Sequence, residues 1–197
     1  MDDSQATRFS LLVRLRDGQD AQAWSEFVDI YSPVVYGFAR RCGLQDADAA
    51  DVAQEVFRTV ARSIKGFECD RRRGSFRGWL MSVVRSRLND FWAAGQRQAA
   101  GSGDTGVQRQ LEAQPCAEDD RNVWEQEYQK SVFAWAAEHV RECVQPSTWQ
   151  AFWQSSVEGK TTREVAESLD MTEGAVYIAK CRVLARVKEK IAELEES

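Results

Sequence analysis

Between residues 46 and 92, apolar side chains recur every three or four positions, the spacing that places them on one face of an α-helix. The first helix predicted in this stretch covers residues 46–64. Its apolar face is made of Val52, Val56, Val60 and Ile64, with Phe57 beside them. Its opposite face is charged and consists of Asp51, Glu55, Arg58 and Arg62. One face is therefore expected in a core, and the other is free to bind a partner.

A second helix is predicted to begin after Ser75, whose hydroxyl can cap the first backbone N–H groups. Its inward residues are predicted to be Phe76, Leu80, Val83, Val84 and Phe91, and its outward residues Arg77, Arg85, Ser86 and Asn89. The basic turn CDRRRG joins the two helices. A polar surface beside a basic and aromatic surface indicates one protein partner and one nucleic-acid partner.

Two more helices are predicted before this stretch. Residues 7–16 place Leu11, Leu12 and Leu15 on one face. The next stripe ends at Gly43 and contains Trp24, Phe27, Ile30, Val34, Val35 and Phe38. Pro33 lies inside it, and because proline costs about 3 kcal/mol in a helix interior, a kink or a break is expected there. These helices predict a compact all-α domain over residues 1–95.

Residues 96–120 contain glycines, no aromatic residue and no sustained periodicity, which predicts a flexible acidic linker. A second helical domain is predicted over residues 121–197. Its first helix carries an apolar stripe of Val132, Trp135, Ala136 and Val140. Ser147 is expected to cap a short helix whose core residues are Trp149, Phe152 and Trp153. The fold class predicted for the whole chain is therefore all-α, with two small domains.

Residues 161–191 have the pattern of a helix-turn-helix. Thr161 and Glu164 have the spacing of a capping box, residues 170–172 form a short turn, and Thr172 can cap the second helix. The inward residues are predicted to be Val165, Ala166 and Leu169, then Val176, Val183, Val187 and Ile191. The outward face of the second helix is predicted to carry Gly174, Ile178, Cys181, Arg182, Ala185 and Lys188, with Tyr177 at its edge. A helix presented in this way can enter the major groove of DNA.

Charge is distributed unevenly along the 197 residues, whose net charge is −5. Residues 58–97 hold ten Arg and Lys against three Asp and Glu, whereas residues 104–127 hold seven acids and two bases. Because phosphate contacts supply most of the affinity for nucleic acid, weak intrinsic DNA binding is expected. No apolar run reaches the roughly 20 residues of a membrane span, and the N-terminus lacks a signal pattern, so a cytoplasmic protein is expected.

No catalytic or metal-binding pattern is found. The five cysteines are scattered and are expected to be reduced thiols. His139 and Cys143 could share a helix face, but a zinc site usually has four ligands, so no metal site is expected. The sequence has no nucleophile elbow and no phosphate-binding glycine loop. We therefore expect neither an enzyme nor a cofactor.

The motif D-x-x-Q-E-x-F at residues 51–57, followed by F-R-x-W-L at 76–80 and by Asp90, resembles region 2 of the extracytoplasmic-function (ECF) group of the sigma-70 family. Residues 158–182 resemble region 4 of the same factors, so the resemblance covers most of the chain. The chain departs from the family pattern at Ser86, where Asn is common, and at Ala93, where Arg is common. Its second helix opens with the apolar sequence AVYIA where the family has Thr-Val-Lys/Arg-Ser-Arg. This departure leaves the upstream promoter sequence open.

The resemblance implies a transcription initiation factor that directs core RNA polymerase to specific promoters. It implies that the large-subunit coiled coil of the polymerase is bound by Asp51, Gln54, Glu55 and Arg58. The melted downstream (−10) promoter element would be held by Arg71, Arg72, Arg73, Arg77, Arg85, Ser86, Arg87, Asn89 and Trp92. The upstream (−35) element would be read as duplex by Thr172, Gly174, Ala175, Tyr177, Ile178, Lys180, Arg182, Arg186 and Lys188. The second domain would also touch the polymerase flap.

Two alternatives remain open. The chain could be a stand-alone helix-turn-helix regulator that needs no polymerase, or a sigma-like interaction module that titrates partners. Regulation by an anti-sigma protein, by phosphorylation or by abundance also stays open.

Overall fold

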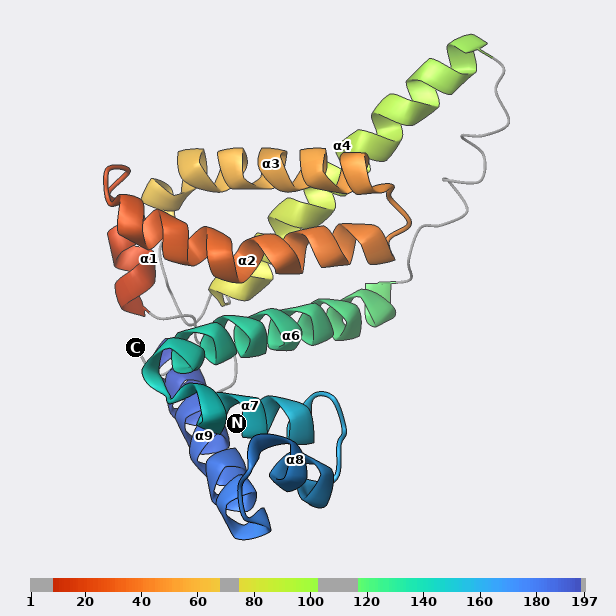
Figure 1. Cartoon of the computed structure of the whole chain (residues 1–197). Coiled ribbons are helices and arrows are strands. Elements are labelled where there is room, and N and C mark those ends of the chain that lie inside the picture. Colours follow the sequence, from red (N-terminus) through yellow and green to blue (C-terminus); the bar gives the residue numbers. More distant parts are fainter. Residues whose placement is uncertain (1–8, 68–74, 103–116, 196–197) are drawn as a thin grey trace. The chain divides into compact units, whose positions relative to one another are not determined.

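The computed structural model describes residues 9–67, 75–102 and 117–195, and the regular elements in these ranges are helices (Figure 1). They are α1 (Phe9–Leu15), α2 (Ala21–Arg41), α3 (Asp46–Ser63), the 3₁₀ helix η1 (Ile64–Gly66), α4 (Phe76–Ser102), α6 (Ala117–Cys143), α7 (Pro146–Ser156), α8 (Thr162–Leu169) and α9 (Glu173–Glu195). The all-α prediction is confirmed. Within the described ranges, no helix combines the length and the apolar character needed to cross a membrane.

The chain divides into two compact units, and the division falls inside α6. Residues 132–194 form unit 2, and Ser131 is the last residue of α6 in unit 1. Helix α4 continues to Ser102 and α6 begins at Ala117, so helical structure enters both ends of the segment predicted as a linker. Residues 103–116 lie outside the described residues. The predicted domain limits stay a prediction, but residues 121–131 group with unit 1.

In unit 1, α2 and α3 lie side by side, α1 packs on α2, and α4 packs on α3 (Figure 1). The predicted inward residues of α1 and α3 are buried. An aromatic cluster joins the helices, because the Phe27 ring lies 4.9 Å from Tyr31, 5.6 Å from Phe57 and 5.9 Å from Phe76, centroid to centroid. Such edge and tilted contacts add to the stabilisation from burial of the rings. The core of unit 1 is therefore built mainly by the predicted stripes. In α4, however, the predicted inward residues Val83 and Phe91 are only half-buried, and Met81 and Leu88 are buried although the pattern did not single them out.

Helix α2 passes through Pro33 as one element, so a break at this position is wrong. Tyr31, Val34 and Val35 on either side of Pro33 are almost fully buried. Burial of these side chains offsets the backbone hydrogen bond that proline cannot donate. The end of α2 is as predicted, because Gly43 has a φ of 89° and the N–H of Leu44 donates to the carbonyl of Ala39.

The N-terminus of α2 is fixed by Asp20. Its carboxylate accepts a hydrogen bond from the backbone N–H of Ala23 at 2.9 Å, and two from the Arg14 guanidinium at 2.8 and 3.0 Å. The bonds from Arg14, and then the bond from Ala23, hold the pKa of Asp20 below its usual value. This carboxylate therefore joins α1 to α2.

The N-terminal half of α6 packs against α2 within unit 1. The Trp124 ring lies 5.6 Å from Phe38, and the Tyr128 ring lies 5.9 Å from Tyr31. The hydroxyl of Ser131 donates to the carbonyl of Ile30. These contacts explain why this half of α6 belongs with the first unit.

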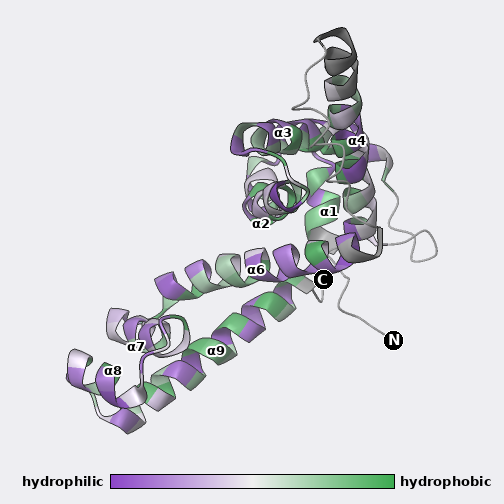
Figure 2. Cartoon of the chain, turned by 90° about the vertical axis from the view of Figure 1, so that its right-hand side faces the viewer, coloured by the Kyte–Doolittle hydropathy of each residue, from purple (hydrophilic) through white to green (hydrophobic). Residues whose placement is uncertain are grey.

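Unit 2 is built from the C-terminal part of α6 with α7, α8 and α9. Along α9, hydrophobic and hydrophilic residues alternate in short runs, as expected for an amphipathic helix (Figure 2). The core beneath the helix-turn-helix is made of Ala151, Val165, Ala166, Val176 and Ala179, with Leu169 and Met171 packed against it. The predicted capping box of Thr161 and Glu164 is present. The turn contains Asp170 at a φ of 52°, a left-handed conformation that Asp tolerates better than most residues.

Two predictions about α7 are wrong. The helix begins at Pro146 with Gln145 as N-cap, so Ser147 lies inside the helix and does not cap it. Proline at the first helical position already has the required φ and lacks only an N–H that would be unbonded there. Trp153 is exposed and not part of the core, although its ring stacks on Trp149 at 5.7 Å. Phe152 is fully buried, as expected.

Candidate protein and nucleic-acid interfaces

The polar face of α3 is fully presented to solvent. Asp51, Gln54, Glu55 and Arg58 are all exposed, and an ion pair joins Glu55 to Arg58. They follow the spacing i, i+3, i+4 and i+7, which places them on one side of the helix. An exposed ion pair of this kind contributes little to stability, so the stripe is available for a partner.

A groove of about 910 Å³ lies beside this stripe, between α2 and α3. Its apolar wall is formed by Trp24, Val28, Pro33, Tyr36 and Phe57, and its polar rim includes Gln54 and Arg58. The sequence did not reveal this groove, because the packing of the two helices decides which residues of α2 face α3, and a local pattern does not show that packing. One signal was available, since Val28 lies off the buried stripe of α2 and is exposed. The hydroxyl of Tyr36 donates to Asp46 at 3.1 Å, and this bond is the main cause that raises the pKa of Tyr36.

Only some of the residues predicted to hold melted DNA lie on the accessible surface of α4. Ser75 caps α4 as predicted, because its hydroxyl accepts from the N–H of Gly78 at 3.2 Å. Ser86 and Asn89 are exposed, and Trp92 is half-buried. Arg71, Arg72 and Arg73 lie outside the described residues.

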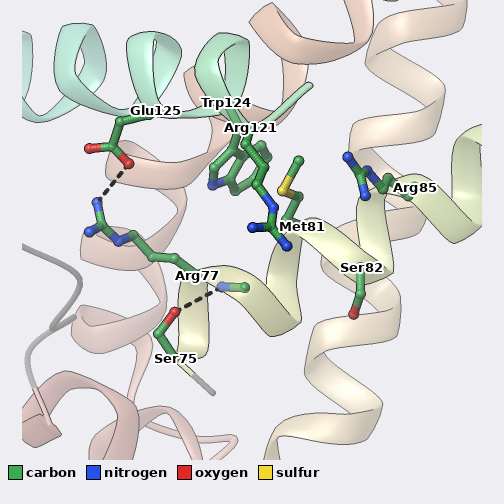
Figure 3. Close-up of a pocket in the computed structure, with 9 residues that line it drawn as sticks. Ser75, Arg77, Met81, Ser82, Arg85, Arg121, Trp124 and Glu125 are labelled. Carbon is green, nitrogen blue, oxygen red and sulfur yellow. Dashed lines mark hydrogen bonds and ion pairs between the residues drawn. The ribbon is translucent and has the colours of Figure 1, made fainter. Parts of the chain in front are cut away.

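The prediction that Arg77 points outward is wrong, because its side chain is 4% exposed. Its guanidinium lies 3.6 Å from Glu125 of α6 (Figure 3). It also lies 4.1 Å from the centroid of the Tyr128 ring of the same helix. The prediction for α4 used its own periodicity and did not consider contacts with α6, because most of α6 was predicted to belong to the second domain. Tertiary packing therefore buries a residue that a single amphipathic helix would expose.

Arg85 and Arg87 also have acidic neighbours. Arg85 forms an ion pair with Asp120 of α6 at 3.0 Å, and Arg87 forms one with Asp90 at 3.0 Å. Both arginines are half-buried. The N-terminal half of α6 thus neutralises part of the basic surface of α4.

A pocket of about 470 Å³ opens where α4 and α6 meet within unit 1 (Figure 3). Its lining includes Arg77, Arg85 and the exposed Arg121, together with Glu125. Trp124 also lines it, and in the part of the chain that the structure describes its buried indole N–H has no hydrogen-bond partner. The pocket is therefore rich in donors and carries more positive than negative charge.

The second candidate surface is α9. Thr172 caps it as predicted, since its hydroxyl accepts from the N–H of Ala175 at 3.1 Å. The inward residues Val176, Val183 and Val187 are buried, while Ile191 is half-buried. The residues on the predicted DNA-facing side that are exposed are Thr172, Gly174, Tyr177, Ile178, Arg182, Arg186 and Lys188, whereas Ala175 and Lys180 are half-buried. The structure therefore keeps most of this predicted set on one accessible surface.

The cysteines and the histidine that the structure describes show no sign of a catalytic or metal site. Cys42 is buried, and burial raises the pKa of its thiol to about 12. Cys143 and Cys181 are free and exposed. His139 packs its ring on Trp135 and places Nδ1 2.8 Å from the carbonyl of Trp135. In the described ranges, no cluster of three or more His, Cys, Asp and Glu side chains could hold a metal ion.

Comparison with known proteins finds a family match that lies within unit 1. Residues 27–98, which cover most of α2, all of α3 and most of α4, match the family Sigma-70 region 2. The ECF RNA polymerase sigma factor RpoE of Cereibacter sphaeroides is 32% identical over 90 residues, which are 45% of this chain and 49% of that protein. Residues 27–98 are therefore similar to sigma-70 region 2, and the resemblance of the chain to ECF sigma factors is confirmed. It spans about half the length of the relative that it matches.

A solved structure, that of CnrH in complex with the cytosolic domain of CnrY, aligns with 95% of this chain and 96% of its own. The sequence identity is 14% and the TM-score is 0.36. A similarity of this degree adds no argument about the function of the chain.

Proposed function

We propose that this chain is a transcription initiation factor, which binds core RNA polymerase and directs it to specific promoters. The observation that carries the proposal is the region 2 match over residues 27–98, in which α3 presents its polar stripe beside an apolar groove. A partner helix could place apolar side chains in the groove and polar side chains against Gln54 and Arg58. In this proposal Asp51, Gln54, Glu55 and Arg58 bind the coiled coil of the large polymerase subunit.

The proposed downstream DNA surface lies on α4, and Arg71, Arg72 and Arg73, which precede α4 in the sequence, are proposed to extend it. Ser86 and Asn89 are exposed and can hydrogen-bond an unstacked base, and Trp92 can stack on one. Arg85 and Arg87 supply positive charge, together with the proposed contributions of Arg71, Arg72 and Arg73. Arg77 can join them only if α6 moves away, because the side chain is now covered by Glu125 and Tyr128.

Unit 2 is proposed to read the upstream element as duplex with the exposed face of α9. The capped start of α9 and the cations at Arg182, Arg186 and Lys188 support this assignment. Arg186 is also held by the carbonyl of Cys143 at 2.9 Å, which fixes its position. In this proposal the polymerase performs the chemistry and this chain selects the start site. Both steps would take place in the cytoplasm.

The test is a pull-down of core RNA polymerase with the full chain. Gln54→Ala and Glu55→Arg are expected to weaken retention of the polymerase at least tenfold, because both lie on the exposed stripe of α3. Glu138→Arg is the matched control, since Glu138 is an exposed residue of α6 in unit 2 and is not part of that stripe. A circular dichroism spectrum of each variant checks that the helices are intact. Equal retention of all four proteins would reject the proposed polymerase surface.

Run-off transcription with the reconstituted holoenzyme separates the alternatives. Initiation at specific promoters supports the proposal. Tight duplex binding by the chain alone, with no polymerase retained, indicates a stand-alone regulator. Polymerase binding without initiation at any promoter indicates a module that titrates partners.

A further inference from the structure

The first two turns of α9 carry an apolar surface at the position where a recognition helix contacts bases. Tyr177 is 65% exposed and Ile178 is 57% exposed, the highest values among the large hydrophobic residues that the structure describes. Both follow Thr172, whose hydroxyl caps the helix. Residues at this end of the second helix of a helix-turn-helix lie nearest to base edges in the major groove.

The side chains that read purines are scarce in these two turns, where Lys180 is the one exception. Guanine is recognised chiefly by Arg or Lys, and adenine by Asn or Gln. Residues 173–180 contain no Arg, Asn or Gln, and the single Lys180 is half-buried. The apolar group that a base pair offers in the major groove is the methyl group of thymine.

The shape of this surface favours close approach of DNA to Ile178. Gly174 lies one turn before it, is exposed, and a Cβ at that position would meet nothing within 4 Å. Arg182 lies one turn after it and Lys188 follows, and both are exposed. An apolar contact at the base edges is thus followed along the helix by cations that suit phosphate groups.

We propose that α9 recognises thymine methyl groups in the upstream duplex, with Ile178 as the main contact and Tyr177 beside it. Arg182 and Lys188 bind the flanking phosphates. The inference rests on the proposed function, which places α9 on duplex promoter DNA. It predicts that the preferred upstream element has thymine, and not guanine, at the base pairs that the first two turns of α9 contact.

The test uses full-length chain with core RNA polymerase and duplexes selected from a pool randomised in the upstream element. Each thymine of the selected duplex is then replaced in turn by deoxyuridine, which removes the methyl group and leaves the hydrogen-bonding pattern unchanged. At one or two thymines the replacement is expected to weaken binding by about fourfold, the effect of one buried methyl group. A selected element without thymine at these positions, or equal affinity for every deoxyuridine duplex, overturns the inference.

Substitution of the protein identifies the contact. Ile178→Ala is expected to weaken binding of the thymine duplex and to remove the deoxyuridine effect, so that both duplexes bind alike. Ile178→Val should retain part of the effect. Val157→Ala is the matched control, because Val157 is an exposed apolar residue of unit 2 outside α9 and should keep the full fourfold difference. A full deoxyuridine effect in Ile178→Ala would overturn the assignment.

Failure of this inference can be distinguished from failure of the proposed function. Promoter-specific run-off transcription without a deoxyuridine effect rejects only the thymine contact. If the holoenzyme does not initiate, the comparison of thymine and deoxyuridine duplexes is repeated with the chain alone. If the chain alone prefers the thymine duplexes, the thymine contact is supported even without the polymerase. If it does not, both the thymine contact and the proposed function are rejected.

Discussion

The guanidinium carbon of Arg77 lies 4.1 Å from the centroid of the Tyr128 ring, which joins the first turn of α4 to the N-terminal half of α6. A cation over an aromatic face contributes about 2 kcal/mol when both groups are desolvated. Arg77 is almost fully buried, so it meets that condition. In this arrangement Arg77 stabilises unit 1 and is not available to DNA.

Tyr128→Leu is expected to lower the free energy of unfolding by about 2 kcal/mol or more, because it removes the aromatic face from a buried cation. Tyr128→Phe keeps the ring and should lower it less. Urea denaturation followed by circular dichroism measures both. Tyr177→Leu is the control, since Tyr177 is exposed and its loss should change stability by less than about 0.5 kcal/mol. Similar values for Tyr128→Leu and Tyr177→Leu would contradict a stabilising contact.

Asp120→Asn is expected to tighten binding of single-stranded downstream promoter DNA by about two- to fivefold, because it releases Arg85 from its ion pair. Fluorescence anisotropy with the full chain measures the affinity at low and high salt, and the gain should shrink as salt screens the charges. Glu138→Gln makes the same change in net charge at an exposed ion pair with Arg141. If the two variants gain equally, the effect comes from net charge and not from Arg85.

Stability should fall at acidic pH through Asp20 and Glu164. Hydrogen bonds from Arg14 to Asp20, and from the Thr161 backbone and hydroxyl to Glu164, lower the pKa of each carboxyl. A lowered folded-state pKa means that the stabilisation is complete above the ordinary values of 3.8 and 4.5 and is lost as the pH falls through the folded values. Thermal unfolding across this range should show a shallower acid decline for the double variant Asp20→Asn and Glu164→Gln. Parallel curves for wild type and variant would contradict this linkage.

Cys42 is expected to resist thiol reagents in the folded protein, because it is buried and its pKa is raised to about 12. Cys181 is exposed and should react readily at mildly alkaline pH. Peptide mapping by mass spectrometry after short labelling times measures both sites, and labelling in urea should make them equivalent. Equal labelling rates for Cys42 and Cys181 without denaturant would contradict the buried environment.

The local helix signals were reliable guides to the fold. The apolar stripes of α1 and α3, the caps at Ser75, Thr161 and Thr172, and the end of α2 at Gly43 are all present as predicted. Each depends on residues within one or two helical turns, so the sequence contains the needed information. A kink or a break was expected at Pro33, and a break is wrong because burial of Tyr31, Val34 and Val35 stabilises both sides of the proline.

The sequence by itself determined that the described residues are helical and that α3 and α9 each keep an exposed face. It also determined that residues 51–90 carry motifs resembling sigma-70 region 2. Only the tertiary structure decided that α2 completes a groove beside the α3 stripe, and that α6 buries Arg77 and pairs with Arg85. Helix periodicity depends on neighbours three and four residues apart, whereas these contacts join different helices, such as Arg77 to Glu125 and Arg85 to Asp120. Their identity depends on which side chains pack together, and no local pattern encodes that choice.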